Sequence, residues 1–264
     1  MNITFLKLGG SLITDKKKPY TLRPQIIKQT ISEISEILVE NKDTHLVLGN
    51  GAGSFAHQSA AKFGTANGFN DKIGLLGTSI VHHDAMKLNQ ILIEECLEQK
   101  LPVFSVQPSA IVSSANKIPS YANFEIVEKL LKSDFIPFLY GTVIFDEKIG
   151  STIFSTDTIF KLLAIYLQKQ GNNIQIIQAG DYDGVLDKNN KLIAKITPEN
   201  FENISSSIMI SDSVDVTGGM KHKVHELLQL AKTGIQSRII NGKIKGNIKK
   251  ALLANSGGTL ITTD

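Results

Sequence analysis

The stretch Phe5-Leu6-Lys7-Leu8-Gly9-Gly10-Ser11 decides how the fold begins, because an apolar run there ends at a lysine and a pair of glycines. Residues 3–8 are expected to form a buried strand, and the glycines after it would let backbone N–H groups approach an anion closely. The Lys7 ammonium suits phosphate oxygens, although a strand-end lysine that simply reaches solvent is the alternative. The stretch therefore predicts a phosphate-binding turn at the end of the first strand.

Two further segments combine glycines with cationic or histidine side chains: Gly49-Asn50-Gly51-Ala52-Gly53-Ser54-Phe55-Ala56-His57 and Thr217-Gly218-Gly219-Met220-Lys221-His222-Lys223. Apolar residues at helical spacing follow Lys223, which places this lysine in the first turns of a helix, where unpaired N–H groups attract phosphate. Each segment alone is weak evidence, since most glycine-rich segments are simple turns. Three of them at strand ends favour an enzyme that handles phosphate groups.

Composition limits the classes of protein that the chain can represent. Its 264 residues suffice for one large α/β domain or two closely joined lobes. A hydrophobic content of 42% and a charged content of 20% are typical of a soluble globular protein, and a net charge of +3 is too small to indicate a nucleic-acid partner. No apolar run approaches the roughly 18 residues of a membrane span, and the single Cys96 excludes an intrachain disulfide. We expect a soluble cytoplasmic protein with no membrane or nucleic-acid partner.

Strand-like runs alternate with helical patterns along the chain, which is typical of parallel βαβ units. Helices are expected over residues 24–39 and 80–99, with a polar, glycine-containing stretch at 64–77 before the second. Residues 142–154 have the pattern of a hairpin. Further strands are expected at 45–48, 103–106, 135–140, 174–178 and 238–240, with 260–262 closing an edge of the sheet.

Four motifs together resemble those of the amino acid kinase superfamily: Lys7-x-Gly9-Gly10-Ser11, the loop 51–53, Asp181-Tyr182-Asp183-Gly184-Val185, and Gly218-Gly219-Met220-x-x-Lys223. Their order and spacing cover nearly the whole chain. Within the superfamily, Gly53-Ser54-Phe55-Ala56-His57 and Ile13-Thr14-Asp15-Lys16 are similar to segments of isopentenyl phosphate kinases and the related fosfomycin kinases. The resemblance implies a three-layer α/β/α sandwich around a mainly parallel sheet, with ligands at the carboxyl ends of the strands.

The resemblance also implies an activity. We expect an ATP-dependent kinase that phosphorylates a small phosphomonoester, converting isopentenyl phosphate to isopentenyl diphosphate, with Mg²⁺ accompanying ATP, no dedicated protein metal site and a homodimeric assembly. A phosphonate kinase of the fosfomycin type, or a kinase of another alkyl phosphate, is the nearest alternative. A nucleotide-binding sensor or storage protein without activity is the alternative of another class. In the single domain 1–264, a boundary near Gly171 would divide an acceptor-binding lobe, 1–170, from a nucleotide-binding lobe, 171–264.

Four charged residues carry the catalytic expectations. Phosphoryl transfer between two phosphates brings many negative oxygens together, so neutralisation of charge and in-line positioning dominate. By the resemblance, Lys7 would hold the transferring group, Lys16 would stabilise the transition state, and Lys223 would balance the terminal phosphates of the nucleotide. Asp157 would orient the lysines, although a helix N-cap before residue 158 is the alternative for this carboxylate.

His57 is expected in the first turn of a helix, where it would donate a hydrogen bond to the acceptor phosphate. A lone histidine is more often structural, and we expect His82 and His83 to be solvent-facing helix positions. The acceptor set implied by the resemblance is Ala52, His57 and Thr156. The nucleotide set is Lys7, Gly9, Gly10, Ser11, Gly53, Asp181, Gly218, Gly219 and Lys223, and Asp181 has a turn cap as its alternative role.

Several positions depart from the family pattern. Ala52 and Ala56 stand where the family often has glycine, Thr142 replaces an aspartate, and Thr156 replaces a glycine before Asp157. An added methyl group or a β-branched side chain narrows the space around an acceptor phosphate, so the departures leave ATP use intact and the identity of the acceptor open. The alkyl tail of the acceptor is expected in an apolar pocket lined by residues 68–86.

Overall fold

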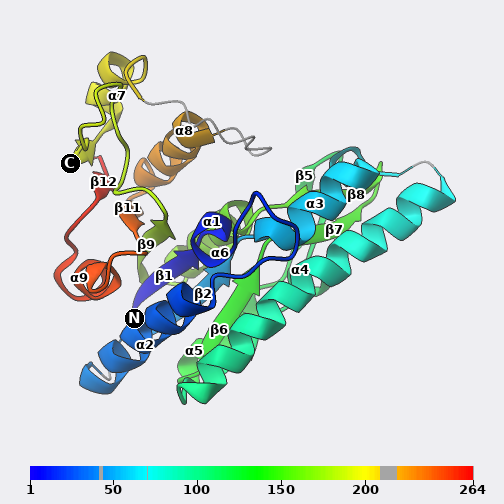
Figure 1. Ribbon diagram of the computed structural model, residues 1–264, viewed down its shortest axis with the longest axis horizontal. Coiled ribbons are helices and arrows are strands. Elements are labelled where there is room, and N and C mark those ends of the chain that lie inside the picture. The colour runs from blue at the N-terminus through cyan, green and yellow to red at the C-terminus, as the bar shows by residue number, and fades with distance from the viewer. Residues whose placement is uncertain (42–43, 70, 209–218, 264) are drawn as a thin grey trace.

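The computed structural model describes residues 1–41, 44–69, 71–208 and 219–263, and it is built around one large sheet of eight strands. Every neighbouring pair in this sheet is parallel except one, which confirms the predicted, mainly parallel sheet. The strands are β1 Asn2–Leu8, β2 His45–Asn50, β3 Val103–Ser105, β6 Ile136–Tyr140, β9 Asn173–Gly180, β10 Lys195–Ile196, β11 Gln236–Asn241 and β12 Thr259–Ile261. Their spatial order is β10-β12-β11-β9-β1-β2-β6-β3, with β11 and β12 antiparallel. Figure 1 labels the six strands from β12 to β6 in this order.

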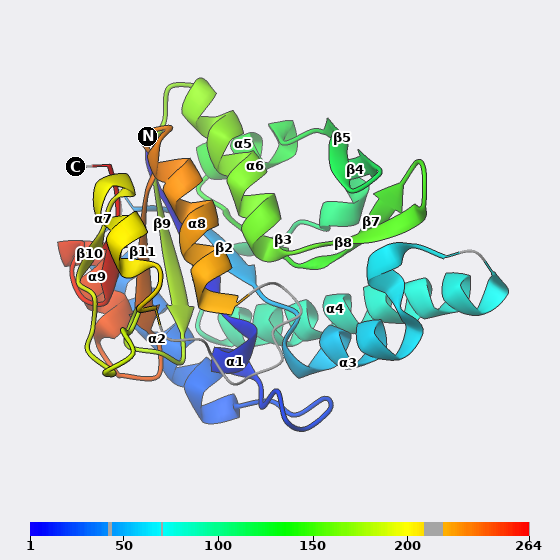
Figure 2. The same cartoon turned by 90° about the horizontal axis from the view of Figure 1, so that it is seen from above.

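Helices cover both faces of this sheet (Figure 2). One face carries α5 Glu125–Lys132, α6 Thr156–Lys169 and α8 Gly219–Ala231, and the other carries α2 Pro24–Glu40, α4 Lys72–Glu98 and α9 Asn247–Ala254. The predicted three-layer α/β/α sandwich is therefore confirmed. The remaining helical segments are α1 Gly10–Ile13, α3 Gly53–Phe63, α7 Pro198–Ile204 and the 3₁₀ turns η1 Thr65–Asn67 and η2 Pro108–Ala110.

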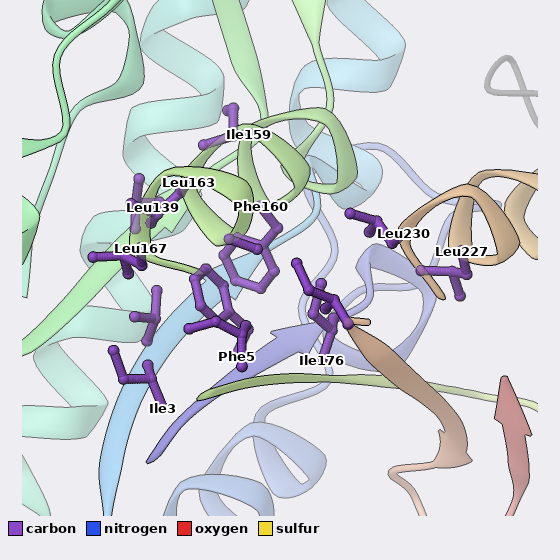
Figure 3. Close-up of a cluster of buried hydrophobic side chains, with 14 of the residues drawn as sticks. Ile3, Phe5, Leu139, Ile159, Phe160, Leu163, Leu167, Ile176, Leu227 and Leu230 are labelled. Carbon is purple, nitrogen blue, oxygen red and sulfur yellow. The ribbon is translucent and has the colours of Figure 1, made fainter. Parts of the chain in front are cut away.

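The two cores follow from the alternation of side chains along the strands. Phe5 of β1 points to one face, where its ring meets Phe160 of α6 edge-on with the ring centroids 5.0 Å apart (Figure 3). The next residue, Leu6, points to the other face and joins a second cluster with Ile31 and Leu92. Because both faces of β1 are buried, most of the strand is apolar, and the charged residue, Lys7, lies near its carboxyl end.

A second, smaller sheet extends beyond the main one, near α3 and α4 (Figure 2). It contains β4 Val112–Ala115, β5 Ile118–Ala122, β7 Thr142–Asp146 and β8 Gly150–Phe154, in the order β5-β4-β7-β8. The antiparallel pair β7–β8 confirms the predicted hairpin, whereas the hairpin β4–β5 was not predicted. The buried carboxylate of Asp146 joins the two hairpin turns, because it accepts backbone hydrogen bonds from Asn116 and Lys117 on one side and from Lys148 and Ile149 on the other.

Two predictions about elements were wrong. Helix α4 begins at Lys72, well before residue 80, because the side chain of Asp71 caps it by accepting a hydrogen bond from the backbone N–H of Gly74 at 2.7 Å. Strand β12 does not close the sheet, since the two-residue strand β10 lies outside it. The other predicted helix and strands lie where expected, with ends shifted by a few residues.

The division into two lobes stays a prediction. Gly171 lies in the turn between α6 and β9, and β9 pairs with β1 over seven positions, so one sheet continues across the predicted boundary. No helix among the described residues is long and apolar enough to cross a membrane.

Candidate active site

A cavity of about 870 Å³ opens at the carboxyl ends of β1, β2 and β9. Its wall brings together segments far apart in the sequence: the turn after β1, the start of α3, the start of α6, the loop after β9 and the start of α8. The predicted site residues that line it are Lys7, Gly9, Gly10, Ser11, Lys16, Ala52, His57, Thr156, Asp157, Asp181, Gly219 and Lys223. Gly53 is buried behind the wall and does not line the cavity, and Gly218 lies outside the described residues.

The glycines after β1 and β2 let two turns pack directly on each other. A Cβ atom at Gly10 would lie 2.6 Å from the backbone nitrogen of Gly53, so neither turn could approach the other with a side chain there. Gly53 has φ +54°, and a Cβ atom on it would lie 2.5 Å from the hydroxyl of Thr14. That hydroxyl instead accepts a hydrogen bond from the backbone N–H of Ser54 at 2.9 Å. Gly53 thus allows the two turns to pack closely against each other. Its predicted contact with ATP stays a prediction.

The centre of the cavity holds a lysine–carboxylate pair. The ammonium of Lys7 lies 2.5 Å from Oδ2 of Asp157, and the amide of Gln178 donates to Oδ1 of the same carboxylate at 2.7 Å. Asp157 comes from the first turn of α6, whose N-cap is Ser155, so the N-cap alternative for Asp157 is wrong. Lys7 and Gln178 are register partners on the neighbouring strands β1 and β9.

Burial and neighbouring charges set the protonation of this pair. Burial lowers the pKa of Lys7 below its ordinary value, while the charge of Asp157 raises it and the charge of Lys223 lowers it further. Burial alone would raise the pKa of Asp157, but the positive charges of Lys7 and Lys223 hold that pKa below its ordinary value. The carboxylate is therefore ionised, and the two lysines share its negative charge.

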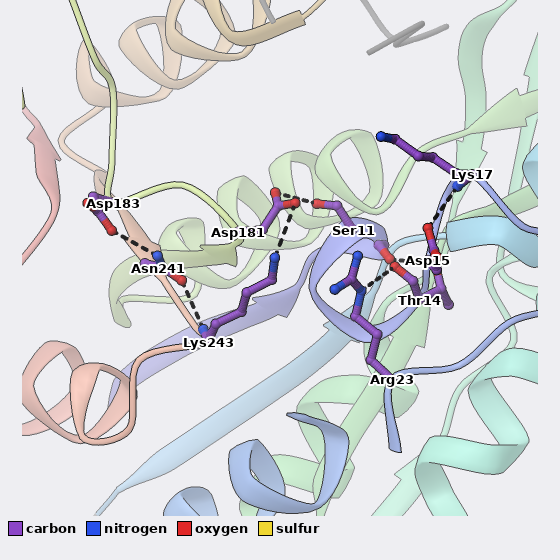
Figure 4. A network of polar contacts seen from close by, with 10 residues as sticks. Ser11, Thr14, Asp15, Lys17, Arg23, Asp181, Asp183, Asn241 and Lys243 are labelled. Carbon is purple, nitrogen blue, oxygen red and sulfur yellow. Dashed lines mark hydrogen bonds and ion pairs between the residues drawn. The ribbon is translucent and has the colours of Figure 1, made fainter. Parts of the chain in front are cut away.

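Lys16 lies on a loop that hydrogen bonds hold over the cavity. The hydroxyl of Tyr20 donates to the buried carboxylate of Asp84 on α4 at 2.7 Å, and the side chain of Arg23 donates to the carbonyl oxygen of Thr14 at 3.0 Å (Figure 4). The first contact ties the loop to α4, and the second joins the two ends of the loop to each other. Lys16 also lowers the pKa of Lys7, so its charge acts at the centre of the cavity.

Two of the residues predicted to bind the acceptor lie on α3 and α6, and the third, Ala52, lies directly before α3. His57 is half-buried and faces the cavity as the fifth residue of α3, so it stands in the second turn and not in the predicted first turn. The hydroxyl of Thr156 donates to the carbonyl oxygen of Asn50 at 2.6 Å and is fully buried, so it stabilises the turn after β2. Of the described residues in the predicted tail region 68–86, only Val81 lines the cavity. The apolar lining residues that α3, η1 and β8 contribute are Ala56, Ala60, Ala61, Ala66, Ile153 and Phe154.

Asp181 lies at the opposite side of the cavity, after β9. Its Oδ1 atom accepts a hydrogen bond from the hydroxyl of Ser11 at 2.8 Å, and its Oδ2 atom lies 3.7 Å from the ammonium of Lys243 (Figure 4). Gly219 begins α8 with φ +69°, and Lys223 follows one turn later on the same helix. Glycine and lysine are thus placed at the start of α8 as the sequence predicted.

A sequence model of the amino acid kinase family matches residues 2–241. The chain belongs to the amino acid kinase family. Isopentenyl phosphate kinase from Methanocaldococcus jannaschii is 32% identical over 265 residues, which cover 98% of each chain. The enzyme of the same name from Methanothermobacter thermautotrophicus is 30% identical over 271 residues, covering 97% of this chain and 98% of the relative. A solved isopentenyl phosphate kinase structure superposes with a TM-score of 0.77 at 26% identity, covering 99% of this chain and all of the other.

The resemblance read from the motifs is thereby confirmed, but sequence reasoning missed Gln178 and Arg23, which line the cavity, and Lys243, which pairs with Asp181. Gln178 was detectable, because it is a polar residue in an apolar strand next to the strand that carries Lys7. Arg23 and Lys243 stand in ordinary surface loops, and no sequence pattern marks them. His82 was predicted to face solvent, which is wrong, since it is half-buried and lies 2.9 Å from the hydroxyl of Ser109.

Within the described part of the chain, no group of three or more His, Cys, Asp or Glu side chains is placed to hold a metal ion. Both carboxylates that line the deep part of the cavity already contact donors on each oxygen, Asp157 through Lys7 and Gln178, and Asp181 through Ser11 and Lys243.

Proposed function

We propose that the chain transfers the γ-phosphoryl group of ATP to the phosphate of isopentenyl phosphate and so forms isopentenyl diphosphate. One observation carries this proposal: a cluster of lysines at the centre of the cavity continues directly into an apolar extension on the side of His57. The lysine cluster would neutralise the negative phosphate groups of the two substrates, and the apolar extension would bind a short hydrocarbon tail. The relatives named isopentenyl phosphate kinase, similar over nearly their whole length, support the same activity.

The lysines supply the chemistry that this transfer requires. A phosphate oxygen of the acceptor attacks the γ-phosphorus, the bond from that phosphorus to the β–γ bridging oxygen breaks, and ADP leaves with the electron pair. The acceptor oxygen needs no general base, because a phosphomonoester with a second pKa near 6 is largely deprotonated at neutral pH. Lys7 would hold the transferring group, Lys16 would face the acceptor side, and Lys223 would balance the charge on the leaving ADP. Asp157 would keep Lys7 protonated and in place.

ATP would bind along the turn after β1 and the start of α8, where Gly9, Gly10 and Gly219 line the cavity without side chains and so let the phosphates approach the backbone. The N–H of Gly9 itself donates to the carbonyl oxygen of Ala179 at 2.8 Å and fixes the turn beside β9. Mg²⁺ would be bound mainly by the nucleotide phosphates and by water, since Asp157 and Asp181 already contact protein donors. When bound, the ion would neutralise charge on the phosphates. A protein cage for the metal is not required in this arrangement.

The acceptor would bind between His57 and the apolar extension. His57 would donate a hydrogen bond to the acceptor phosphate, and the alkyl tail would lie against Ala56, Ala60 and Val81. A phosphonate of the fosfomycin type is compact and would leave this apolar wall uncovered, so the wall favours an alkyl phosphate. A sensor or storage protein would not need lysines on both sides of the transferred group, which favours a catalytic role.

The homodimer and the cytoplasmic location remain proposals. Strand β3 lies at an open edge of the main sheet, and the rings of Phe104 and Phe135 pack on each other there while each stays more than 40% exposed. This exposed aromatic pair supports self-association at that edge. Light scattering after size exclusion measures the assembly, and a monomeric mass at micromolar concentration would exclude the dimer.

A panel of acceptors tests the proposed function. With ATP and Mg²⁺, kcat/KM is compared for isopentenyl phosphate, dimethylallyl phosphate, fosfomycin, glutamate and N-acetylglutamate, and isopentenyl phosphate is expected to give the highest value. A His57→Ala variant should lose about tenfold to a hundredfold in kcat/KM for the acceptor, since a hydrogen bond to a charged group is removed, while KM for ATP is retained. A carboxylate as the preferred acceptor would refute the proposal, and equal losses for both substrates would remove His57 from the acceptor site.

A further inference from the structure

The turn after β11, residues 241–246, is joined to the loop after β9 by three contacts. The backbone N–H of Gly242 donates to the carbonyl oxygen of Gly180 at 2.8 Å, and the side-chain amide of Asn241 donates to Asp183 at 2.8 Å. The third contact is the ion pair of Lys243 with Asp181, 3.7 Å from nitrogen to oxygen. This ion pair reaches the cavity through Asp181, which lines the wall. Lys243 itself does not line the cavity.

The direction of the Lys243 side chain follows from how its backbone is held. Its N–H donates to the side-chain oxygen of Asn241 at 3.0 Å, and its carbonyl oxygen accepts a hydrogen bond from the side chain of Gln29 on α2 at 3.3 Å. Both backbone groups are thus fixed, and the side chain extends along the outside of the loop toward Asp181 (Figure 4). Its side chain is 32% exposed and that of Asp181 is 22% exposed, so water screens the pair only in part.

A carboxylate at this place creates an electrostatic problem for the kinase. The proposed nucleotide carries several negative charges, and an uncompensated Asp181 in the cavity wall would repel them. The same carboxylate is needed, because it accepts the hydrogen bond from Ser11, the residue that follows the two glycines of the phosphate-binding turn. A cation behind the cavity wall would satisfy both requirements, because it neutralises the charge of Asp181 without occupying the space of the nucleotide.

We propose that Lys243 is a positioning residue for the nucleotide, which acts through Asp181 and Ser11 without touching the ligand. It neutralises Asp181 from outside the cavity and holds the carboxylate in the position at which the Ser11 hydroxyl reaches it. This inference rests on the proposed use of ATP and adds a residue that the motifs do not contain. Lys243 should therefore affect the affinity for ATP and leave the transfer step and the acceptor site unchanged.

A Lys243→Met variant tests the proposal in the full chain. Its dissociation constant for ATP, measured by equilibrium titration without acceptor, should rise about fivefold, in line with the loss of one partly exposed ion pair. KM for ATP should rise by the same factor, while kcat and KM for the acceptor stay at the wild-type values. Lys243→Arg should bind ATP like the wild type. Lys245→Met removes the same charge from an exposed position of the same turn, and it should bind ATP as the wild type does.

A double mutant separates action through Asp181 from a general effect. In an Asp181→Asn background, Lys243→Met should cause no further loss of ATP affinity, because the charge that Lys243 neutralises is gone. A full fivefold loss in that background would overturn the proposal, and so would wild-type ATP affinity in Lys243→Met or an equal loss in Lys245→Met. If the wild type itself fails to bind ATP, the proposed function fails together with this inference. Wild-type binding with an unaffected Lys243→Met variant refutes the inference alone.

Discussion

The centre of the cavity and its apolar extension are built in opposite ways. At the centre, Lys7 is 8% exposed, and each oxygen of its partner Asp157 has a donor, so the geometry is fixed by hydrogen bonds between β1, β9 and α6. The extension is lined mainly by apolar side chains from α3, α4 and the small sheet, so its surface is formed largely by packing. We infer that reaction and acceptor are encoded separately: β1, β9, the loop after α1 and the first turns of α6 and α8 carry the charged centre, and α3, α4 and the small sheet shape the space proposed for the acceptor.

The largest effect should come from the centre. Lys7→Met keeps the length of the side chain and removes the charge that would face the transferring group. We expect kcat to fall by about 10²–10³, as for other losses of a preorganised electrostatic contact in a transition state. The measurement is steady-state kinetics with saturating ATP and acceptor.

Because Lys7 is buried beside Asp157, its removal also leaves a carboxylate without its partner, so folding must be checked separately. Thermal unfolding of the variant shows whether the fold persists. Lys161→Met, which breaks the ion pair with Glu226 at the surface of α6, is the matched control and should retain wild-type kcat. A folded Lys7→Met variant with near-normal turnover would show that the centre is not where the reaction occurs.

The second prediction concerns the pH dependence of the centre. Burial and Lys223 lower the pKa of Lys7, and Asp157 raises it, so Asp157→Asn should lower that pKa further. An opposite charge at this distance shifts a pKa by about one to three units. If Lys7 must be protonated for transfer, the alkaline limb of the pH–rate profile should move to lower pH by about one unit or more in Asp157→Asn. If the alkaline limb stays at the same pH in Asp157→Asn, the group that titrates in this limb is not Lys7.

The sequence predicted the charged centre better than the extension, and the reason is physical. A lysine in a buried strand is costly unless it has a partner, so Lys7 was conspicuous, and the glycines beside it marked a turn where two backbones approach. The strands of the main sheet were equally easy to predict, because strands buried on both faces are rich in apolar residues. The strand β12 was misplaced at the edge, because the two residues of β10 are too short to leave a pattern.

The apolar extension was hard to predict, because an alanine in the sequence does not indicate whether it lines a pocket, packs in the core or faces solvent. Ala60, Ala61 and Ala66 line the cavity, whereas the described residues of the region expected to do so, 68–86, contribute only Val81. The early start of α4 explains the error: its first turns point Ile73 and Leu76 into solvent, with more than 60% of each residue exposed. Apolar residues at helical spacing predict that a helix has an apolar face. Tertiary packing decides whether this face contacts the core, a ligand or solvent. The position of Lys243 also depends on tertiary packing, because its partner Asp181 is 62 positions away in the sequence. The sequence pattern therefore could not predict this ion pair.

The smallest effect should come from the extension and should depend on the acceptor. Ala60→Val adds two methyl groups to the wall on α3 and narrows the space for a tail, at a cost of about 1 kcal/mol, or fivefold. We expect kcat/KM for isopentenyl phosphate to fall by about this factor, while methyl phosphate, which has no tail to place, reacts as with the wild type. Gln58→Val puts the same β-branched residue on the exposed side of α3 and controls for the loss of helix propensity. Because the added methyl groups lie away from Lys7 and Asp157, kcat for methyl phosphate is the decisive value. If it falls together with that for isopentenyl phosphate, the extension is coupled to the centre, and reaction and acceptor are not encoded separately in this fold.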